Sequence, residues 1–515
     1  MTAGSVAAGH PLTAEAAAEV LRAGGNAFDA VVAAFCAACV AEPVLASLGG
    51  GGFLLARQAD RSPEVFDFFA QTPRTRRPVE ETDFRPIMAD FGDASQEFHI
   101  GLGAIATPGA VAGIFAIHSE LCRLPIAELL APASDMARQG VSMTPFQQGI
   151  NRIIEPILRA TPEALALFAD PDHPDRLAPA GAQMRMPDLA SALDALVTEG
   201  PQIFYRGEWA HRMTRDCAEG GGHLRLDDLA AYRVERRPAL WCSYRGADVY
   251  TNPPPSQGGS LIGFTLALLE AVDLGALGRG RAAHIHALAS AQELTQRLRR
   301  DASFDHADWA AALEPETLKQ FRTMMQDAVS FTRGTTQISV ADAEGNLASL
   351  TLSNGEGCGY VLPGTGIMVN NMLGEEDVNP HGFHRWPTDR RISSMMAPTL
   401  VALSDGTWVV TGSSGSNRIR SAILQVISNL VDLGLDLEPA VAAPRIHFEG
   451  GLLNLEPPVE AEICMQLARR WDNVKVWSQP SIFFGGAHTV MVDAQGRARG
   501  AGDPRRGGVA LDISD

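Results

Sequence analysis

Two alternating segments joined by a short turn constrain the fold of the last third of the chain. In residues 337–342, apolar Ile338 and Val340 lie two positions apart, and in residues 347–353 apolar residues again alternate with serine and threonine. The residues between them, Ala-Glu-Gly-Asn at 343–346, have turn chemistry. Because successive side chains of a strand point to opposite faces, we predict a β-hairpin with one apolar and one hydroxyl-bearing face. The hydroxyl-bearing face of its second strand would carry Ser349, Thr351 and Ser353.

The residue at the head of the first strand suggests a specific chemistry. Counting back from the turn places Thr335 opposite Ser353 or Asn354, because the register is uncertain by one residue. Gly334 precedes it, and an unbranched residue leaves its carbonyl open to attack by the Thr335 hydroxyl. An N-to-O acyl shift and hydrolysis would free an α-amine, whose ordinary pKa of about 7.7–8.0 lets it act as general base for its own hydroxyl. The alternative is an ordinary threonine-rich strand, which these residues alone favour.

The charge of the chain argues against two classes of partner. The 515 residues carry a formal net charge of −18, which disfavours a nucleic acid or an anionic membrane surface. The longest apolar run, residues 30–41, is too short for a bilayer, which needs about 20 residues. The first ten residues lack the basic and apolar regions of a secretory signal. We therefore expect a soluble, cytoplasmic protein without nucleic-acid or membrane partners.

The cysteines and histidines do not indicate a metal or a cofactor. The seven cysteines are scattered, which does not suggest a disulfide framework. Cys36 and Cys39 form a C-x-x-C pair, but they lie inside an apolar run and are interpreted as small core residues. His447 and His488 lack partners at ligand spacing. We expect neither a metal nor a cofactor.

Outside the hairpin, the pattern predicts mixed helix and strand. Thr13 is a candidate N-cap for a helix to about Ala23, and Asn26 for a second, buried helix. The glycine run at 49–52 leads into a strand at 53–56. Further predicted elements are a mostly helical region at 110–199, a helical turn at 227–232, a strand at 241–250, a helix from about 260, strands around 366–370 and 408–412, and a helix from 417 to about 433.

Short motifs spread along the whole chain resemble those of the γ-glutamyltransferase family. They are, in order, His10–Ala16, Gly24–Ala30, Gly49–Gly52, Thr107-Pro108-Gly109, Pro253–Gly259, Thr335-Thr336, Asn370-Asn371, Ser393-Ser394-Met395, Thr411–Gly415 and Gly502-Asp503-Pro504. Each motif is weak alone, but their order over the chain makes a strong signal. The resemblance implies an α/β fold of the N-terminal-nucleophile type, an αββα four-layer sandwich. It also implies cleavage between Gly334 and Thr335 into a large fragment, 1–334, and a small fragment, 335–515, which remain one intertwined unit.

The resemblance also implies roles for individual residues. Thr335 corresponds to the family's nucleophile and new N-terminus. Thr351 and Ser353 match its hydroxyl-bearing second strand, and Ser353 stands where the family has a threonine that assists processing. The other matches are Ser393 and Ser394, for a serine pair that holds the donor's α-carboxylate, and Gly415 and Ser416, for a glycine pair whose N–H groups form the oxyanion hole. A plain turn at 393–394 and a helix-entry glycine at 415 are the alternatives.

Departures from the family pattern fall where the amino acid head of the donor would be bound. Phe69 replaces the arginine that clamps the α-carboxylate, and a phenyl ring cannot substitute for a guanidinium fork; the nearest following arginine is Arg74. The acid that grips the donor's amine would be Glu375 or Glu376. The other departures are Gln337 in place of a common histidine and Gly355 in place of an asparagine, for which the adjacent Asn354 is a substitute.

The resemblance leaves three functions open. The first is a self-processing hydrolase or transferase that cleaves a γ-glutamyl or related small amide through an acyl-Thr335 intermediate. The second is a relative acting on a non-glutamyl substrate, such as an oxamate-type amide or a side chain removed by carbon–carbon cleavage in alkylproline biosynthesis. The third is an unprocessed, non-catalytic family member. The expected partners are a small-molecule amide and, within a heterodimer, the two fragments themselves, with higher oligomers left open.

Overall fold

The chain is built around two antiparallel sheets. The computed structural model describes residues 2–90, 95–300, 317–318, 335–379 and 382–514, so the predicted processing residue Gly334 lies outside the described residues. The first sheet has the order β10 (Glu235–Pro238), β3 (Glu64–Phe68), β2 (Gly51–Arg57), β14 (Leu347–Ser353), β13 (Thr336–Asp342), β1 (Thr2–Ala8), β24 (Val509–Ser514). The second has the order β11 (Leu240–Tyr244), β12 (Ala247–Thr251), β17 (Thr399–Ala402), β18 (Trp408–Thr411), β22 (Thr489–Val492), β23 (Ala498–Ala501).

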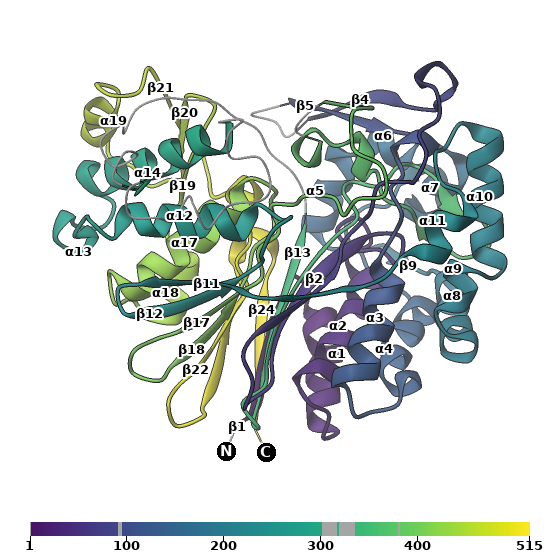
Figure 1. The fold of residues 1–515 in the computed structure, drawn as a ribbon, viewed down its shortest axis with the longest axis horizontal. Helices are drawn as coiled ribbons and strands as arrows, with labels where there is room; N and C mark the ends of the chain where they lie inside the picture. The colour runs from purple at the N-terminus through teal and green to yellow at the C-terminus, as the bar shows by residue number, and fades with distance from the viewer. Residues whose placement is uncertain (1, 91–94, 301–316, 319–334, 380–381, 515) are drawn as a thin grey trace.

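The two sheets face each other, with helices on either side (Figure 1). On the first sheet pack α1 (Pro11–Arg22), α2 (Ala27–Ala41) and α3 (Ala110–Leu121), with α4 (Ile126–Gln139) against α2. On the second pack α12 (Gly258–Leu269) and α18 (Leu437–Ala442), with α14 (Ala282–Arg300) and α17 (Arg418–Val431) against α12. Strands β1 and β13 contact β22 of the opposite sheet. This mixture of helix and sheet confirms the predicted α/β class.

The remaining elements surround these layers. The helices are α5 (Pro145–Ile153), α6 (Glu155–Leu158), α7 (Pro162–Phe168), α8 (Pro187–Glu199), α9 (Gln202–Tyr205), α10 (Glu208–Gly220), α11 (Leu226–Ala231), α13 (Leu274–Leu277) and α19 (Ala461–Leu467). The strands are β4 (Arg85–Asp90), β5 (Ser95–Ile100), β6 (Val141–Ser142), β7 (Ala169–Asp170), β8 (His173–Leu177), β9 (Gln183–Met184), β15 (Val361–Leu362), β16 (Ile367–Met368), β19 (Ile446–Glu449), β20 (Leu452–Leu455) and β21 (Asn473–Val476). Within the described ranges, no helix has the length and apolar character needed to cross a bilayer.

The predicted hairpin is confirmed as β13 and β14. Thr336 pairs with Leu352, so one further step places Thr335 opposite Ser353, the first of the two predicted registers. The apolar side chains of both strands are buried in the core that faces α1 and α2. The other face is turned toward the second sheet, because the Ser349 hydroxyl donates to the Thr411 carbonyl oxygen at 2.7 Å. This face is therefore buried between the sheets and still rich in hydroxyl groups.

The start of the first helix differs from the prediction. Thr13 is not the N-cap: α1 begins at Pro11, and His10 caps it by accepting a hydrogen bond from the Leu12 N–H at 3.2 Å. Proline suits the first helical position because its φ is already helical and its missing N–H is not needed there. Asn26 is confirmed as the cap of α2, in a capping box with Asp29.

The strand predicted at 241–250 is two strands. Its middle residues, Arg245 and Gly246, have φ angles of 52° and 79° and turn the chain back on itself. Strands β11 and β12 therefore pair with each other as a hairpin. Two consecutive residues with positive φ form the type of turn that matches the twist of paired strands, and an alternating pattern alone does not reveal it.

Candidate active site

Thr335 lies at the end of a row of residues that crosses the first sheet. It directly precedes β13 and is 3% exposed. The pairings of β13 with β14, β14 with β2, and β2 with β3 place Ser353, Gly51 and Phe69 successively beside it. Because neighbouring strands lie about 4.8 Å apart, Phe69 is about 14 Å from Thr335 along this row. The row gives the direction in which a substrate's acyl group could extend from the nucleophile.

Thr351 is opposite Gln337 and not opposite Thr335. Its hydroxyl donates to Gln337 Oε1 at 2.6 Å, and Gln337 Nε2 donates to the Ser349 and Ser339 hydroxyl oxygens at 2.9 and 3.1 Å. The Gln337 side chain also fills the space beside Gly412, where an added Cβ would be 2.2 Å from Gln337 Oε1. Thr351 and Gln337 therefore belong to a polar layer between the sheets, one step below the nucleophile.

Arg506 connects Thr335 to the loop that carries Gly415 and Ser416. Arg506 donates from Nη1 to the Thr335 carbonyl oxygen at 3.3 Å, and a Cβ on Gly415 would be 3.3 Å from its Nη2. Gly415 and Ser416 have φ angles of 105° and 52°, and the loop leads into α17. Among the described residues, none accepts a hydrogen bond from the Gly415 N–H. A free N–H is the first condition for an oxyanion hole.

Ser416 occupies a conformation that favours glycine. Its φ of 52° lies in the left-handed region, where a Cβ costs about 1–2 kcal/mol. We expect Ser416→Gly to relieve this strain and raise the melting temperature by about one to two degrees. Thermal unfolding followed by circular dichroism measures the change. Ser416→Ala is the matched control, because it removes the hydroxyl but keeps the Cβ. An equal rise in melting temperature in both variants would contradict the explanation by backbone strain.

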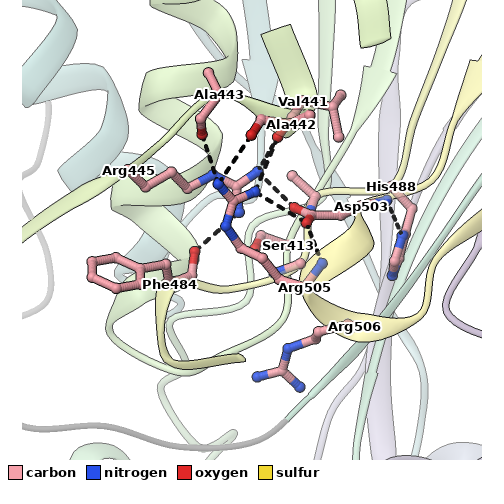
Figure 2. A network of polar contacts seen from close by, with 12 residues as sticks. Ser413, Val441, Ala442, Ala443, Arg445, Phe484, His488, Asp503, Arg505 and Arg506 are labelled. Carbon is pink, nitrogen blue, oxygen red and sulfur yellow. Dashed lines mark hydrogen bonds and ion pairs between the residues drawn. The ribbon is translucent and has the colours of Figure 1, made fainter. Parts of the chain in front are cut away.

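A buried ion-pair network supports the loop (Figure 2). Asp503 accepts from Arg445 Nη2 at 2.6 Å, Arg505 Nη1 at 3.2 Å and the Ala487 N–H at 2.8 Å. Arg445 also donates to the Phe484 carbonyl oxygen at 3.0 Å. Burial alone would raise the pKa of Asp503, but the two guanidinium groups hold it well below its ordinary value. The network fixes residues 484–487, on which the loop rests.

The contact between this segment and the loop is direct. The Gly486 N–H donates to the Ser413 hydroxyl oxygen at 3.2 Å, and the Ser414 N–H donates to the Gly486 carbonyl oxygen at 3.3 Å. Ser413 and Ser414 immediately precede Gly415. The position of the Gly415 N–H therefore depends on the Asp503 network.

The segment that follows Ser353 lies against an acid and an amide, Glu375 and Asn371. Gly355 has a φ of 64°, and a Cβ there would be 2.1 Å from Asn371 Oδ1 and 2.5 Å from Glu375 Oε1. Glu375 is 5% exposed, whereas Glu376 is exposed to solvent. The structure thus brings Glu375, and not Glu376, to the residue beside Asn354. The small residue at position 355 makes room for this acid.

The serine pair lies in the irregular segment that precedes β17. The Ser394 hydroxyl accepts from the Met396 N–H at 3.0 Å, and its carbonyl oxygen accepts from the Ser256 hydroxyl at 2.7 Å. Ser394 is buried and Ser393 is half-buried. These contacts hold Ser394 to neighbouring main chain, and they leave both interpretations of the pair, carboxylate binding and a plain turn, as predictions.

Among the described residues, the arginines near Phe69 are bonded to other groups. Phe69 is 1% exposed and stacks on Phe53 with 5.3 Å between ring centroids. Arg74 pairs with Asp389 at 3.4 Å on the surface. Arg391 is buried, but its guanidinium donates to the carbonyl oxygens of Phe69 and Arg233 and to the Tyr232 hydroxyl. The end of the row is therefore aromatic, and the arginines around it are bound elsewhere.

Two charged residues at the site were not predicted from the sequence. Glu42, just after α2, accepts the hydroxyls of Thr13 at 2.8 Å and Thr336 at 2.9 Å. Burial raises the pKa of Glu42, and these hydrogen bonds oppose the rise. Arg506 is the second. The sequence signal that could have indicated Glu42 is an acid at the end of an apolar, buried helix. For Arg506 the signal is its position two residues after the Gly-Asp-Pro motif.

Several buried polar groups near Thr335 have no hydrogen-bond partner among the residues that the structure describes. Asn354 is 1% exposed, and neither its Oδ1 nor its Nδ2 has a hydrogen-bond partner among the described residues. The same holds for Ser414 Oγ and Arg506 Nε in this part of the structure. Such groups cost free energy when buried unless something else bonds to them. No three His, Cys, Asp or Glu residues in the described ranges are arranged to hold a metal ion.

Comparison with known proteins identifies the family of the chain. The gamma-glutamyltranspeptidase family model matches residues 13–513, so the chain belongs to that family. The chain is 33% identical over 539 residues to an acylase ACY 1 proenzyme of Pseudomonas sp. (strain SE83), covering 99% of this chain and 94% of the relative. It is 28% identical over 542 residues to the glutathione hydrolase proenzyme of Escherichia coli (strain K12), covering 98% and 90%.

Solved structures support the fold. A cephalosporin acylase from Bacillus halodurans superposes with a TM-score of 0.86 at 24% identity, covering 100% of this chain and 96% of that one. The gamma-glutamyltranspeptidase of Helicobacter pylori matches with a TM-score of 0.54 at 28% identity, covering 62% and 91%. The chain is thus an enzyme of the γ-glutamyltransferase type, related to the N-terminal-nucleophile hydrolases.

Proposed function

We propose that the chain is a self-processing acylase that cleaves a small amide through an acyl-Thr335 intermediate. Cleavage before Thr335 would produce fragments 1–334 and 335–515, which stay together as a heterodimer because both contribute strands to each sheet. We assign the two sheets and their outer helices to the αββα sandwich of N-terminal-nucleophile enzymes. The position of Thr335 at the head of a buried strand, beside Ser353 and the Gly415 loop, supports this assignment.

In the proposed mechanism the α-amine of Thr335 takes the proton of the threonine hydroxyl. The hydroxyl oxygen attacks the amide carbonyl carbon, and the N–H groups of Gly415 and Ser416 stabilise the resulting oxyanion. The carbon–nitrogen bond then breaks, and the leaving nitrogen takes the proton from the α-ammonium group. Water attacks the acyl ester in the same way, which releases the acid and restores Thr335; an amine in place of water gives transfer.

The observation that carries the substrate proposal is that, among the described residues, the arginines near the end of the row are bonded to other groups. Phe69 stands where the family resemblance implies the carboxylate clamp, and Arg74 and Arg391 have other partners. A donor carboxylate would find no guanidinium fork there. We therefore infer that the acyl group need not carry the free α-carboxylate of a γ-glutamyl donor. The similarity to acylases supports the same inference.

A γ-glutamyl donor is the second candidate, because one observation favours it. Glu375 is buried beside Asn354, and a buried carboxylate is suited to hold the ammonium group of an amino acid. Oxamate-type amides and carbon–carbon cleavage are further candidate substrates and reactions for the same nucleophile.

Cleavage of three p-nitroanilide substrates distinguishes between these candidate functions. Glutaryl-p-nitroanilide is γ-glutamyl-p-nitroanilide without the α-amine, and butyryl-p-nitroanilide lacks the carboxylate as well. We expect kcat/KM for the butyryl compound to equal or exceed that for the glutaryl compound, because no arginine binds the carboxylate. A strong preference for the γ-glutamyl compound would favour the second candidate. An uncleaved protein inactive on all three would instead indicate a non-catalytic family member.

Restoring the missing arginine is expected to shift the specificity. In Phe69→Arg, kcat/KM for γ-glutamyl relative to butyryl anilide should rise about tenfold or more, because a charge-assisted hydrogen bond is worth about 1.5–3 kcal/mol. Phe69→Leu is the matched control: it removes the ring without adding a charge and should leave the ratio near that of the unaltered enzyme. A folded, self-cleaved Phe69→Arg enzyme with an unchanged ratio would show that position 69 does not contact the donor.

A further inference from the structure

Arg506 is a buried cation whose hydrogen-bond partners, among the described residues, are carbonyl oxygens. It is 5% exposed and donates to the carbonyl oxygens of Thr335 and Ile482, both at 3.3 Å. Its Nε has no acceptor, and no carboxylate lies within ion-pair distance of it, among the residues that the structure describes. The neighbouring arginines differ: Arg445 pairs with Asp503 at 2.6 Å and Arg505 with Glu456 at 2.5 Å. Figure 2 shows Arg506 apart from that cluster.

A charge buried in this way is costly to keep. Buried ions normally pair with an opposite charge, because the protein interior solvates them poorly. Burial lowers the pKa of Arg506 to about 10, and the carboxylates of Glu356, Asp503 and Glu42 oppose that effect from longer range. Arg506 therefore stays protonated in neutral solution. The position of Arg506 offers an explanation for this unfavourable burial, because Arg506 contacts the main chain of Thr335, the proposed nucleophile.

The guanidinium lies where both reacting groups of the nucleophile would feel its charge. It contacts the carbonyl oxygen of Thr335, and the nitrogen of the same residue is then roughly 6 Å from the charge, given standard backbone dimensions. On its other side it borders Gly415. A positive charge at this distance disfavours protonation of an amine and favours an oxyanion.

We propose that Arg506 is a positioning residue that holds the Thr335 main chain and whose charge keeps the freed α-amine of Thr335 neutral, and so basic, at the pH of catalysis. The inference rests on the proposed function, since it requires that amine to exist. Among the described residues, the charged groups around Thr335 include Arg506 itself, Glu42 at the end of α2, which reaches Thr336, and Glu356 and Glu375 in the segments after β14, while Asp503 and Arg445 act on Arg506 from longer range. Arg506 is the positive charge that contacts Thr335, so its removal should raise the pKa of the amine.

The test is the pH dependence of kcat/KM, whose acid limb reports the base of the free enzyme. Self-cleaved Arg506→Gln, Arg506→Lys and the unaltered enzyme are compared on the best anilide from about pH 5 to 9. We expect the acid limb of Arg506→Gln to move up by about one pH unit, and that of Arg506→Lys to stay, because lysine keeps the charge. At neutral pH, kcat should fall at least about tenfold in Arg506→Gln. An unmoved limb in the glutamine variant overturns the proposal.

A control and a second variant complete the test. Arg497→Gln removes a positive charge from an exposed turn and should leave the limb in place. If Arg506→Gln does not cleave itself, Glu356→Gln decides: removing a negative charge that faces Arg506 should move the limb to lower pH, and a limb that stays or rises overturns the proposal. An unaltered enzyme that never cleaves itself and is inactive on every anilide contradicts the proposed function instead.

Discussion

A Thr335→Ala variant is expected to remain a single chain of 54.8 kDa and to lose at least about 10⁴-fold in kcat/KM. Both effects have one cause, because the hydroxyl that opens the chain is the hydroxyl that attacks the substrate. Without self-cleavage no α-amine is freed, so nucleophile and general base are lost together. A denaturing gel, intact mass and the anilide assay measure the two losses on one preparation.

Thr335→Ser is the matched control for this variant. Serine keeps the hydroxyl and lacks only the methyl group, so we expect a cleaved protein with measurable, reduced activity. N-terminal sequencing of its small fragment should begin with the substituted residue. Two fragments in Thr335→Ala, or full activity in an uncleaved chain, would contradict the assignment of Thr335 and with it the acyl-threonine mechanism.

Local patterns in the sequence predicted the hairpin that follows Thr335, the proposed nucleophile. Apolar and polar residues alternate on both sides of a turn, so a period of two gave the strand type and facing, and the turn gave the register to within one residue. Prediction failed where one residue's backbone preference decided the outcome. Pro11 moved the start of α1 ahead of Thr13, and Arg245 with Gly246 divided one predicted strand into two.

The charged members of the site could not be predicted, because their partners are remote in sequence. Glu42 and Thr336 are 294 residues apart, and Arg506 and Thr335 are 171 residues apart. Periodicity reports which face of an element is buried, but it contains no information on which two buried polar groups meet. The resemblance to a family located Thr335 and Gly415; the coordinates add the charges that surround them.

The second large effect is expected at Asp503, in the buried network behind the Gly415 loop. Asp503→Asn keeps the shape of the side chain but removes the negative charge between Arg445 and Arg505. Two buried guanidinium groups would then repel each other without a full counter-charge, since Glu456 pairs with Arg505 alone at this position. Breaking a buried ion pair in this way costs about 3–5 kcal/mol. The Gly415 loop rests on the same network, so kcat should fall as well.

Urea unfolding in the Thr335→Ala background measures this cost on a continuous chain. Asp493→Asn is the control: it breaks the exposed pair with Arg497 at 2.7 Å, and the urea midpoint of this variant should change little.

The pH dependence of unfolding gives a second criterion. Because the pKa of Asp503 is lowered on folding, its contribution is fully present above its unfolded value of about 3.9 and is lost as the pH falls further. The difference in unfolding free energy between chains with and without the Asp503→Asn substitution should therefore be constant from neutral pH to about pH 4 and narrow below it. A difference that is small at neutral pH would mean that the two arginines are held by their backbone carbonyl partners instead.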